Sequence, residues 1–347
     1  MNWNYPITIG DIVVPSKVFF APINPGWCEQ GIASEKYFDF FEQRSGKAIG
    51  ICYIGNVAIH NEWGSNDNTA CLWETESKAW INVVEQIRSN GSIPAIQLAW
   101  KSPSIPAQKD FIANDKNYQL AEYKLFYEKF AEFEEVKSLY VNSIRHAYEL
   151  GFPIVQIHAA HGYAMSLLLS REISGNDNPN ETKGIKLIRE IVESLGEKKP
   201  ILDIRLSFYE GINDDISEKT YKQELISLLI DLGFSIISIS NGLYNIDKTM
   251  IYPPKEDSIL LIDDIVALAE TNPSVVWNVS GNMENLFLST IALPENVTIS
   301  LGRQLIVDPS TLQKIKNDTL DEIKVCTECK RCHYYSYGFK GIMECVL

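Results

Sequence analysis

The chain has 347 residues, of which 45% are hydrophobic and 22% charged, and its formal net charge is −14. This composition can bury a large core, so we expect a folded α/β protein rather than a disordered one. The acidic balance argues against nucleic acid and against an anionic membrane surface as partners, because either would need a basic face. The start "MNWNYPITIG" has no basic leader, and no apolar run approaches the roughly 20 residues of a membrane span. We therefore expect a cytoplasmic protein.

Eight short apolar, β-rich runs recur along the chain. They cover residues 18–23, 49–58, 94–99, 154–159, 201–207, 234–240, 275–280 and 297–302. Between several of them, apolar residues recur at helical spacing in residues 34–46, 77–91, 140–152, 185–196, 222–234 and 258–270. Strands that are apolar on both faces and alternate with helices predict a parallel sheet, and eight repeats of the unit predict a (β/α)8 TIM barrel.

The chain is longer than the about 250 residues of a typical barrel, and the largest addition follows the third strand, at residues 101–135. Its segment "QLAEYKLFYEKFAEFEEVK" is acidic and rich in aromatic residues. We expect a helical insertion over the barrel mouth, either as a substrate lid or as a solvated helix with one packed face. The barrel is expected to span residues 1–320, and a cysteine-rich tail the residues 321–347.

Enzymes with this fold carry their chemistry at the C-terminal ends of the strands. The residues at those ends include Asn24, Gly55, Asn56, Gln97, His158, His161, Arg205, Ser240, Ser280, Gly281, Gly302 and Arg303. Backbone N–H groups of the small residues after strands seven and eight, together with Arg303, can hold a phosphate. Gln97 and Arg205 can form hydrogen bonds with a polar heterocycle. This rim predicts a site for a phosphorylated planar ligand.

His158 lies near the end of the fourth strand, and His161 and Tyr163 follow it in "IVQIHAAHGYAM". A metal site is disfavoured here, because no further His, Asp or Glu cluster lies at the other strand ends and catalytic zinc normally has three protein ligands. A metal-dependent hydrolase that uses the two histidines stays as an alternative.

Seven stretches match one known family in consistent order. They are "VFFAPIN", "FFEQRSGKAIGICYIG", "IQLAW", "AYELGFPIVQIHAAHGYAMSLLLS", "RLS", "SISNG" and "SLGRQLIVDP". From about Ile7 to Ser310, the sequence resembles the old yellow enzyme family of FMN-dependent oxidoreductases. In the tail it resembles the iron–sulfur branch that includes 2,4-dienoyl-CoA reductase and trimethylamine dehydrogenase.

The resemblance implies an FMN over the barrel mouth, NAD(P)H as its reductant, and hydride transfer to an activated alkene of the enone or enoyl type. The implied FMN contacts are Pro22 and Asn24 at the flavin edge, Gln97 and Arg205 at the pyrimidine, and Gly281, Gly302 and Arg303 at the phosphate. His158 and His161 would donate hydrogen bonds to the substrate oxygen and stabilise its developing charge. Tyr163 would protonate the α-carbon as a general acid.

The sequence departs from the family pattern at three places. Trp100 stands where the family's Q-x-x-H pattern has its His. The loop after Ser170 is shortened, and "SGN" after the seventh strand keeps only one of two paired glycines. We therefore expect differences in the flavin-edge contacts, the substrate range and the phosphate contacts.

The tail contains four cysteines in a C-x2-C-x2-C-x12-C pattern: Cys326, Cys329, Cys332 and Cys345. Four thiolates with three in tight spacing can hold a [4Fe–4S] cluster, and the resemblance to the iron–sulfur branch points the same way. A structural zinc, held by the same four or with His333 in place of one, and a set of free thiols are the competing interpretations.

The partners follow from this interpretation. In the named iron–sulfur enzymes a flavin- and nucleotide-binding region follows the tail, whereas this chain stops at Leu347, so a separate electron-donor protein is one expected partner. A small-molecule substrate is the other, and a homo-oligomer is compatible with the sequence. The alternative function is a non-catalytic or degenerate flavin and iron–sulfur electron-transfer subunit.

Overall fold

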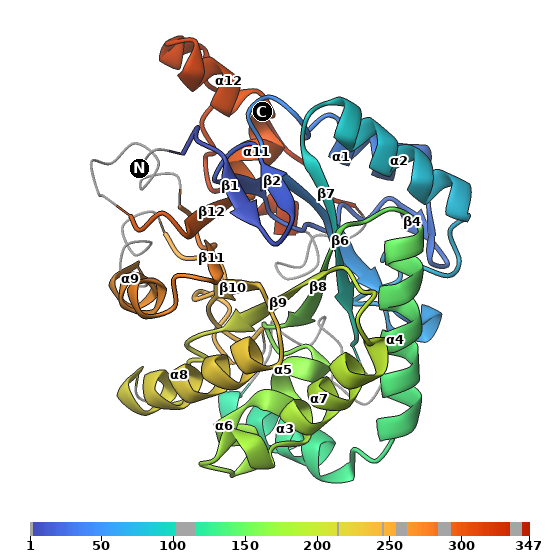
Figure 1. The fold of residues 1–347 in the computed structure, drawn as a ribbon, viewed down its shortest axis with the longest axis vertical. Helices are drawn as coiled ribbons and strands as arrows, with labels where there is room; N and C mark the ends of the chain where they lie inside the picture. The colour runs from blue at the N-terminus through green and yellow to red at the C-terminus, as the bar shows by residue number, and fades with distance from the viewer. Residues whose placement is uncertain are drawn as a thin grey trace.

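The computed structural model describes residues 3–101, 115–213, 215–244, 246–254, 262–283, 293–333 and 342–347. Its centre is a closed barrel of parallel strands, hydrogen-bonded in the order β10-β11-β12-β3-β6-β7-β8-β9 (Figure 1). The strands are β3 (Val18–Phe20), β6 (Ile51–Ala58), β7 (Ile93–Ala99), β8 (Ile154–Ala159), β9 (Ile201–Ser207), β10 (Ile236–Ser240), β11 (Val276–Val279) and β12 (Val297–Leu301). All eight predicted strands, and with them the predicted TIM barrel, are confirmed.

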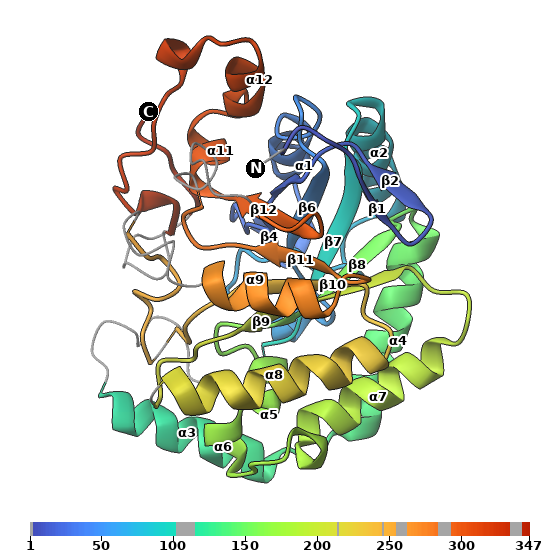
Figure 2. The same cartoon turned by 60° about the vertical axis from the view of Figure 1, so that its left-hand side comes forward.

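Helices cover the outside of this barrel, which explains why the outward faces of the strands are apolar (Figures 1 and 2). The predicted helices are observed as α1 (Glu35–Glu42), α2 (Ser77–Ser89), α4 (Phe133–Glu149), α7 (Lys183–Leu195), α8 (Asp215–Asp231) and α9 (Ile262–Thr271). In α7, for example, Ile185, Ile188 and Ile191 recur at helical spacing and are fully buried. Residues 258–261 of the last predicted helix lie outside the described residues. No helix in the described part of the chain is both long and apolar enough to cross a bilayer.

A hairpin that the sequence did not predict closes the N-terminal end of the barrel. It is formed by β1 (Ile7–Ile9) and β2 (Ile12–Val14), which pair antiparallel. Ile9 and Val14 pack in one buried cluster with Phe19, Ile51 and Ile154, which belong to the barrel strands β3, β6 and β8. Among the described residues, the hairpin thus covers the N-terminal end of the barrel interior. A second short hairpin, β4 (Cys28–Glu29) with β5 (Ile32–Ala33), follows the first barrel strand.

The insertion after the third barrel strand contributes one described helix, α3 (Lys116–Lys129). Phe126 of α3 packs against Trp100 with the ring centroids 6.2 Å apart, and the Tyr123 hydroxyl approaches the backbone at Gly162. Within the described residues this helix is a packed element, and its place over the mouth stays a prediction. Residues 102–114 of the predicted insertion lie outside the described residues, so a lid there stays a prediction.

Short elements complete the C-terminal half of the chain. They are α5 (Ala164–Leu169), α6 (Arg171–Ser174), α11 (Arg303–Val307) and α12 (Thr311–Lys316). From α12 the tail turns back beside α11 along one side of the barrel (Figure 2).

Candidate active site

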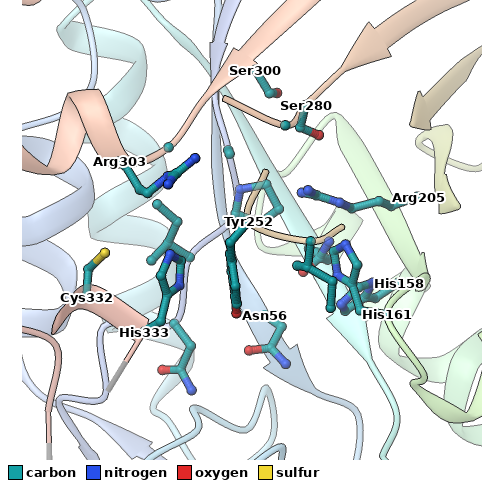
Figure 3. Close-up of a pocket in the computed structure, with 18 of the residues that line it drawn as sticks. Asn56, His158, His161, Arg205, Tyr252, Ser280, Ser300, Arg303, Cys332 and His333 are labelled. Carbon is teal, nitrogen blue, oxygen red and sulfur yellow. The ribbon is translucent and has the colours of Figure 1, made fainter. Parts of the chain in front are cut away.

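One cavity of about 200 Å³ opens at the C-terminal ends of the barrel strands (Figure 3). The residues predicted for cofactor and substrate, which come from six different strand ends, all line it: Pro22, Asn24, Gln97, His158, His161, Tyr163, Arg205, Gly281, Gly302 and Arg303. The barrel topology thus brings together every predicted site residue of the barrel; of the four tail cysteines, Cys332 also reaches this cavity. Their individual roles stay predictions.

Arg205 points into this cavity from β9 (Figure 3). Its side chain is 9% exposed, it forms no hydrogen bond with any described residue, and its Nε is buried without a partner among them. Burial lowers the pKa of Arg205, while Tyr244 and Asp203 counteract that effect. An unpaired buried guanidinium is costly, so this one is suited to a ligand that brings hydrogen-bond acceptors, such as a flavin pyrimidine.

The two histidines lie side by side, with their ring centroids 5.3 Å apart. The His161 backbone has a φ of 62°, and its Nε2 lies 2.7 Å from Ser240 Oγ. His158 Nδ1 has no hydrogen-bond partner among the described residues. Burial, and then the positive charge of Arg205, hold both histidine pKa values well below 6.5. Both rings are therefore neutral at pH 7, and each can donate one N–H.

Tyr163 lies against His158, with the ring centroids 4.1 Å apart. Its hydroxyl oxygen accepts a hydrogen bond of 2.7 Å from Asn56 Nδ2. Asn56, at the end of the second barrel strand, was recognised in the sequence only as a strand-end residue. Its position was the available signal, because the C-terminal ends of neighbouring strands meet at the same rim.

At the predicted phosphate end of the cavity, carbonyl and carboxylate groups of the chain itself accept hydrogen bonds from the donor side chains. Arg303 Nη2 donates to the Pro253 carbonyl oxygen (3.2 Å), and Arg303 forms an ion pair with Glu328 of the tail (3.8 Å). Asn282 Nδ2 donates to the same carbonyl oxygen (3.0 Å) and to Glu328 Oε1 (2.6 Å). Sequence reasoning missed Asn282 and Glu328 at this end.

A buried arginine outside the cavity holds this phosphate end in place. Arg44 donates to the carbonyl oxygens of Leu305 and Ile306, both at 2.9 Å, and so ties α11 to the end of α1. The position of Arg303 at the start of α11 therefore depends on this anchor.

Two residues singled out in the sequence form contacts within the chain. The Asn24 side chain lines the cavity, but it donates to Thr69 Oγ1 (3.1 Å) and accepts from the Gly26 N–H (3.0 Å), so it shapes its own loop. Trp100 does not line the cavity; it packs against Trp63 and Phe130 with centroids 5.6 and 5.5 Å apart. The expected change at the family's His position is thus a change in core packing beside the site.

The tail also reaches the cavity, which the sequence did not predict. Cys332 and His333 line it, and the His333 ring lies 3.7 Å from that of Tyr252. Tyr252 lies between these tail residues with Arg303 on one side and Arg205 with the histidines on the other (Figure 3). Burial, followed by the charges of Arg303 and Lys330, lowers the pKa of His333 to about 3.

The four tail cysteines line a second, smaller cavity next to Arg303. All four are free thiols, and Cys326 Sγ accepts a contact of 3.4 Å from the Glu328 N–H. Burial, followed by Cys326 and Cys329, raises the pKa of Cys332 to about 12. Among the described residues, however, no three His, Cys, Asp or Glu side chains are close enough to hold a metal ion.

Comparison with known proteins places the chain in a family. The profile of the NADH:flavin oxidoreductase / NADH oxidase family matches residues 4–322. An NADH oxidase of Thermoanaerobacter brockii is 22% identical over 92% of this chain and 52% of its own length. A cinnamate reductase of Clostridium sporogenes is 23% identical over 94% of this chain and 54% of its own length. The chain thus spans about half the length of these two relatives.

Solved structures show the same fold. A 2-naphthoyl-CoA reductase complexed with 2-naphthoyl-CoA has a TM-score of 0.76 at 18% identity, covering 99% of this chain and 56% of its own. An old yellow enzyme from Pichia has a TM-score of 0.66 at 18% identity, covering 91% and 87%. Because the family profile covers most of the chain, this protein belongs to the NADH:flavin oxidoreductase / NADH oxidase family, the FMN-dependent oxidoreductases that include old yellow enzyme.

Proposed function

We propose that the chain binds FMN at the barrel mouth and reduces an activated alkene of the enone or enoyl type. The observation that carries this proposal is the buried Arg205 guanidinium, which has no hydrogen-bond partner among the described residues and points into the cavity. Gln97 and Arg205 would hold the pyrimidine, and Gly281, Gly302 and Arg303 the phosphate. Bound FMN would supply the hydride chemistry, which belongs to the cofactor.

The residues around the substrate would supply hydrogen bonds and a proton. His158 and His161 are neutral, so their N–H groups would donate to the substrate carbonyl oxygen and stabilise the negative charge that develops there. Tyr163 would give its proton to the α-carbon. The Asn56 N–H that it accepts stabilises the phenolate left behind, which makes the proton easier to transfer.

The reductant of the bound FMN is proposed to be NAD(P)H. The family description and the relative named NADH oxidase support a nicotinamide. A separate electron-donor protein is the alternative.

For the tail, we propose a [4Fe–4S] cluster held by Cys326, Cys329, Cys332 and Cys345. Support comes from their spacing, their common cavity and their free thiols. As described, the side chains are gathered around the cavity but not at ligand distances, so the cluster would have to draw them together. Zinc on the same thiols and a metal-free tail are the other outcomes of the test.

The test is the visible spectrum of protein purified without oxygen, before and after dithionite, with iron, zinc and acid-labile sulfide measured on the same sample. Bleachable flavin bands, followed by turnover of an enone by the reduced protein, are expected. Flavin without turnover of enones or enoyl thioesters would favour an electron-transfer subunit. A colourless protein that takes up no FMN, and whose activity follows an added metal, would favour a hydrolase and overturn the proposal.

A further inference from the structure

A layer of polar side chains fills the barrel interior just beneath the cavity. The layer is formed by Tyr53, Gln156, Asp203, Ser238 and Asn278, all of them at most 2% exposed. Interiors of such barrels are usually filled by branched apolar residues, and the apolar cluster that packs on the N-terminal hairpin is largely of that kind, although it includes the Tyr53 ring. The polar layer therefore needs an explanation beyond packing.

Three donors of this layer converge on one oxygen of Asp203. Oδ2 accepts hydrogen bonds from the Tyr53 hydroxyl (2.7 Å), from Gln156 Nε2 (2.5 Å) and from the Ser238 hydroxyl (3.1 Å). Oδ1 has no partner among the described residues, and none of the described cations forms an ion pair with Asp203. The titratable groups that face it are Tyr53 on β6 and Arg205 on β9, whereas β8, β10 and β11 present uncharged Gln156, Ser238 and Asn278.

The hydrogen bonds to Asp203 determine which groups donate and which accept in a relay, a chain of hydrogen bonds that runs from Asp203 through Gln156 to Gln97 at the cavity. A carboxylate oxygen only accepts, so Gln156 must turn its NH2 group to Asp203 and its Oε1 away from it. Gln156 Oε1 then accepts from Gln97 Nε2 at 2.6 Å. With its NH2 committed to Gln156, Gln97 keeps its carbonyl oxygen for a ligand in the cavity that it lines.

A second branch of the relay ends in the same way. Ser238 donates to Asp203, so its oxygen accepts from Asn278 Nδ2 at 3.0 Å. Asn278 Oδ1 in turn accepts from the Ser300 hydroxyl at 2.9 Å, which leaves the Ser300 oxygen as an acceptor in the cavity. Through both branches, the Asp203 carboxylate therefore leaves an acceptor oxygen, that of Gln97 or that of Ser300, available at the ligand site.

We infer that Asp203 is a positioning residue that, through Gln156, makes Gln97 present an acceptor in the cavity that the Arg205 guanidinium also lines. Such a pair selects a planar heterocycle with an N–H next to a carbonyl, and the pyrimidine edge of FMN carries one N–H, at N3, between two carbonyls. The inference rests on the proposed function, because it assumes that the heterocycle is FMN.

Burial of Asp203 is compatible with this role over a range of pH. Burial raises the pKa of Asp203 to about 7, and the three donors and Arg205 counteract that effect. A proton can occupy Oδ1, which has no partner, while Oδ2 continues to accept. The relay therefore keeps its direction in both protonation states.

The test measures binding of FMN and of N3-methyl-FMN, which lacks the N3–H, to apoprotein by fluorescence quenching. Asp203→Leu and Gln156→Met both remove the relay and fill its place with an apolar side chain of similar size. One hydrogen bond is worth about tenfold in affinity. We expect each variant to bind FMN about tenfold more weakly than the unaltered protein while its affinity for N3-methyl-FMN is unchanged. Asp203→Asn, which can turn its carbonyl oxygen to the same three donors, is expected to restore FMN binding.

A control separates the relay from general damage to the barrel. Glu218→Gln alters another buried carboxylate, which accepts from the backbone N–H groups of Glu210 and Ile212 and does not line the cavity. Its affinities for both flavins should be unchanged. If folded Gln156→Met binds both flavins more weakly by the same factor, the residue has a merely structural role and the inference is overturned. Full FMN affinity in both relay variants would also overturn it. Failure of the unaltered protein to bind FMN would instead contradict the proposed function.

Discussion

The barrel mouth and the cysteine tail are determined by the chain in different ways. At the mouth, hydrogen-bonded strands carry ten predicted residues from six strand ends into one cavity. In the tail, four predicted cysteines line one small cavity without reaching the distances of metal ligands. A closed parallel sheet fixes where its ends meet whether or not a ligand is bound, whereas a segment without strands or long helices relies on its ligand for final geometry.

The tail backbone supports this contrast. Glu328 and Lys330, which lie between the first three cysteines, have φ angles of 56° and 65°. This left-handed conformation costs roughly 1 kcal/mol for a residue with a side chain. Tight turns of this kind bring cysteines close together, and binding energy from a metal centre would offset their cost. The mouth needs no such contribution, because packing of the barrel supports it.

The first prediction concerns the proton donor that we propose at the barrel mouth. Tyr163→Phe removes the proposed proton donor but keeps the ring against His158, so alkene reduction should slow about a hundredfold with FMN affinity unchanged. Stopped-flow oxidation of the dithionite-reduced protein by an enone measures this step without an electron donor. Tyr244→Phe is the matched control, because Tyr244 also lines the cavity while its hydroxyl pairs with Tyr252. Equal slowing in both variants would contradict the proposal that Tyr163 is the proton donor.

The second prediction concerns the polar layer that supports the mouth. The pKa of Asp203 is raised from 3.8 to about 7 in the folded protein, so the folded state binds this proton more tightly than the unfolded state. The stability associated with that proton is present at low pH and is lost as pH rises towards 7. From about 1.4 kcal/mol per pH unit, the free energy of unfolding should fall by about 3 kcal/mol more in the unaltered protein than in Asp203→Asn between pH 5 and 8.

Urea unfolding of the two proteins at both pH values measures this difference. His158 and His161 change stability in the opposite direction, because their lowered pKa values cost stability as pH falls below 6.5. Their contribution is common to both proteins and cancels in the comparison. Parallel pH profiles would mean that Asp203 titrates near its ordinary value.

The third and smallest expected effect tests whether the tail and the mouth are independent. Cys329→Ser should remove the iron of the proposed cluster, while FMN affinity changes by less than about twofold, because Cys329, unlike Cys332, does not line the larger cavity. Cys28→Ala is the control, because Cys28 is a buried cysteine outside the tail and should retain the iron. Metal analysis and a flavin titration give both results. Joint loss of iron and FMN would show that the mouth, too, depends on the tail.

The parts that could be predicted are those that a local pattern encodes. Strand periodicity gave the barrel, and the barrel gave the rim residues, because strand order determines which ends meet. The sequence "ILDIRLS" also contained a signal that was overlooked: Asp203 and Arg205 are two residues apart in a strand and so share a face. Asp203 could therefore have been placed inside the barrel.

Other parts of the site could not be predicted, because they depend on long-range packing. The approach of Tyr252 to His333 joins a loop after β10 to the tail, 81 residues further along the chain by their numbering. The closing hairpin at residues 7–14 consists of two strands of only three residues each, too short to give a clear period. Arg44 holds α11 through carbonyl oxygens that no sequence pattern marks.

The most direct test of the account is a flavin titration of apoprotein and of Arg205→Met. Arg205 has no hydrogen-bond partner among the described residues, so the proposed FMN site should depend on it heavily, whereas Arg145→Met, on the outer helix α4, should have no effect. The account predicts one FMN per chain, with affinity at least about a hundredfold lower in Arg205→Met, since hydrogen bonds to charged groups contribute about 1.5–3 kcal/mol each. Equal FMN affinity in the unaltered protein and in Arg205→Met would contradict it.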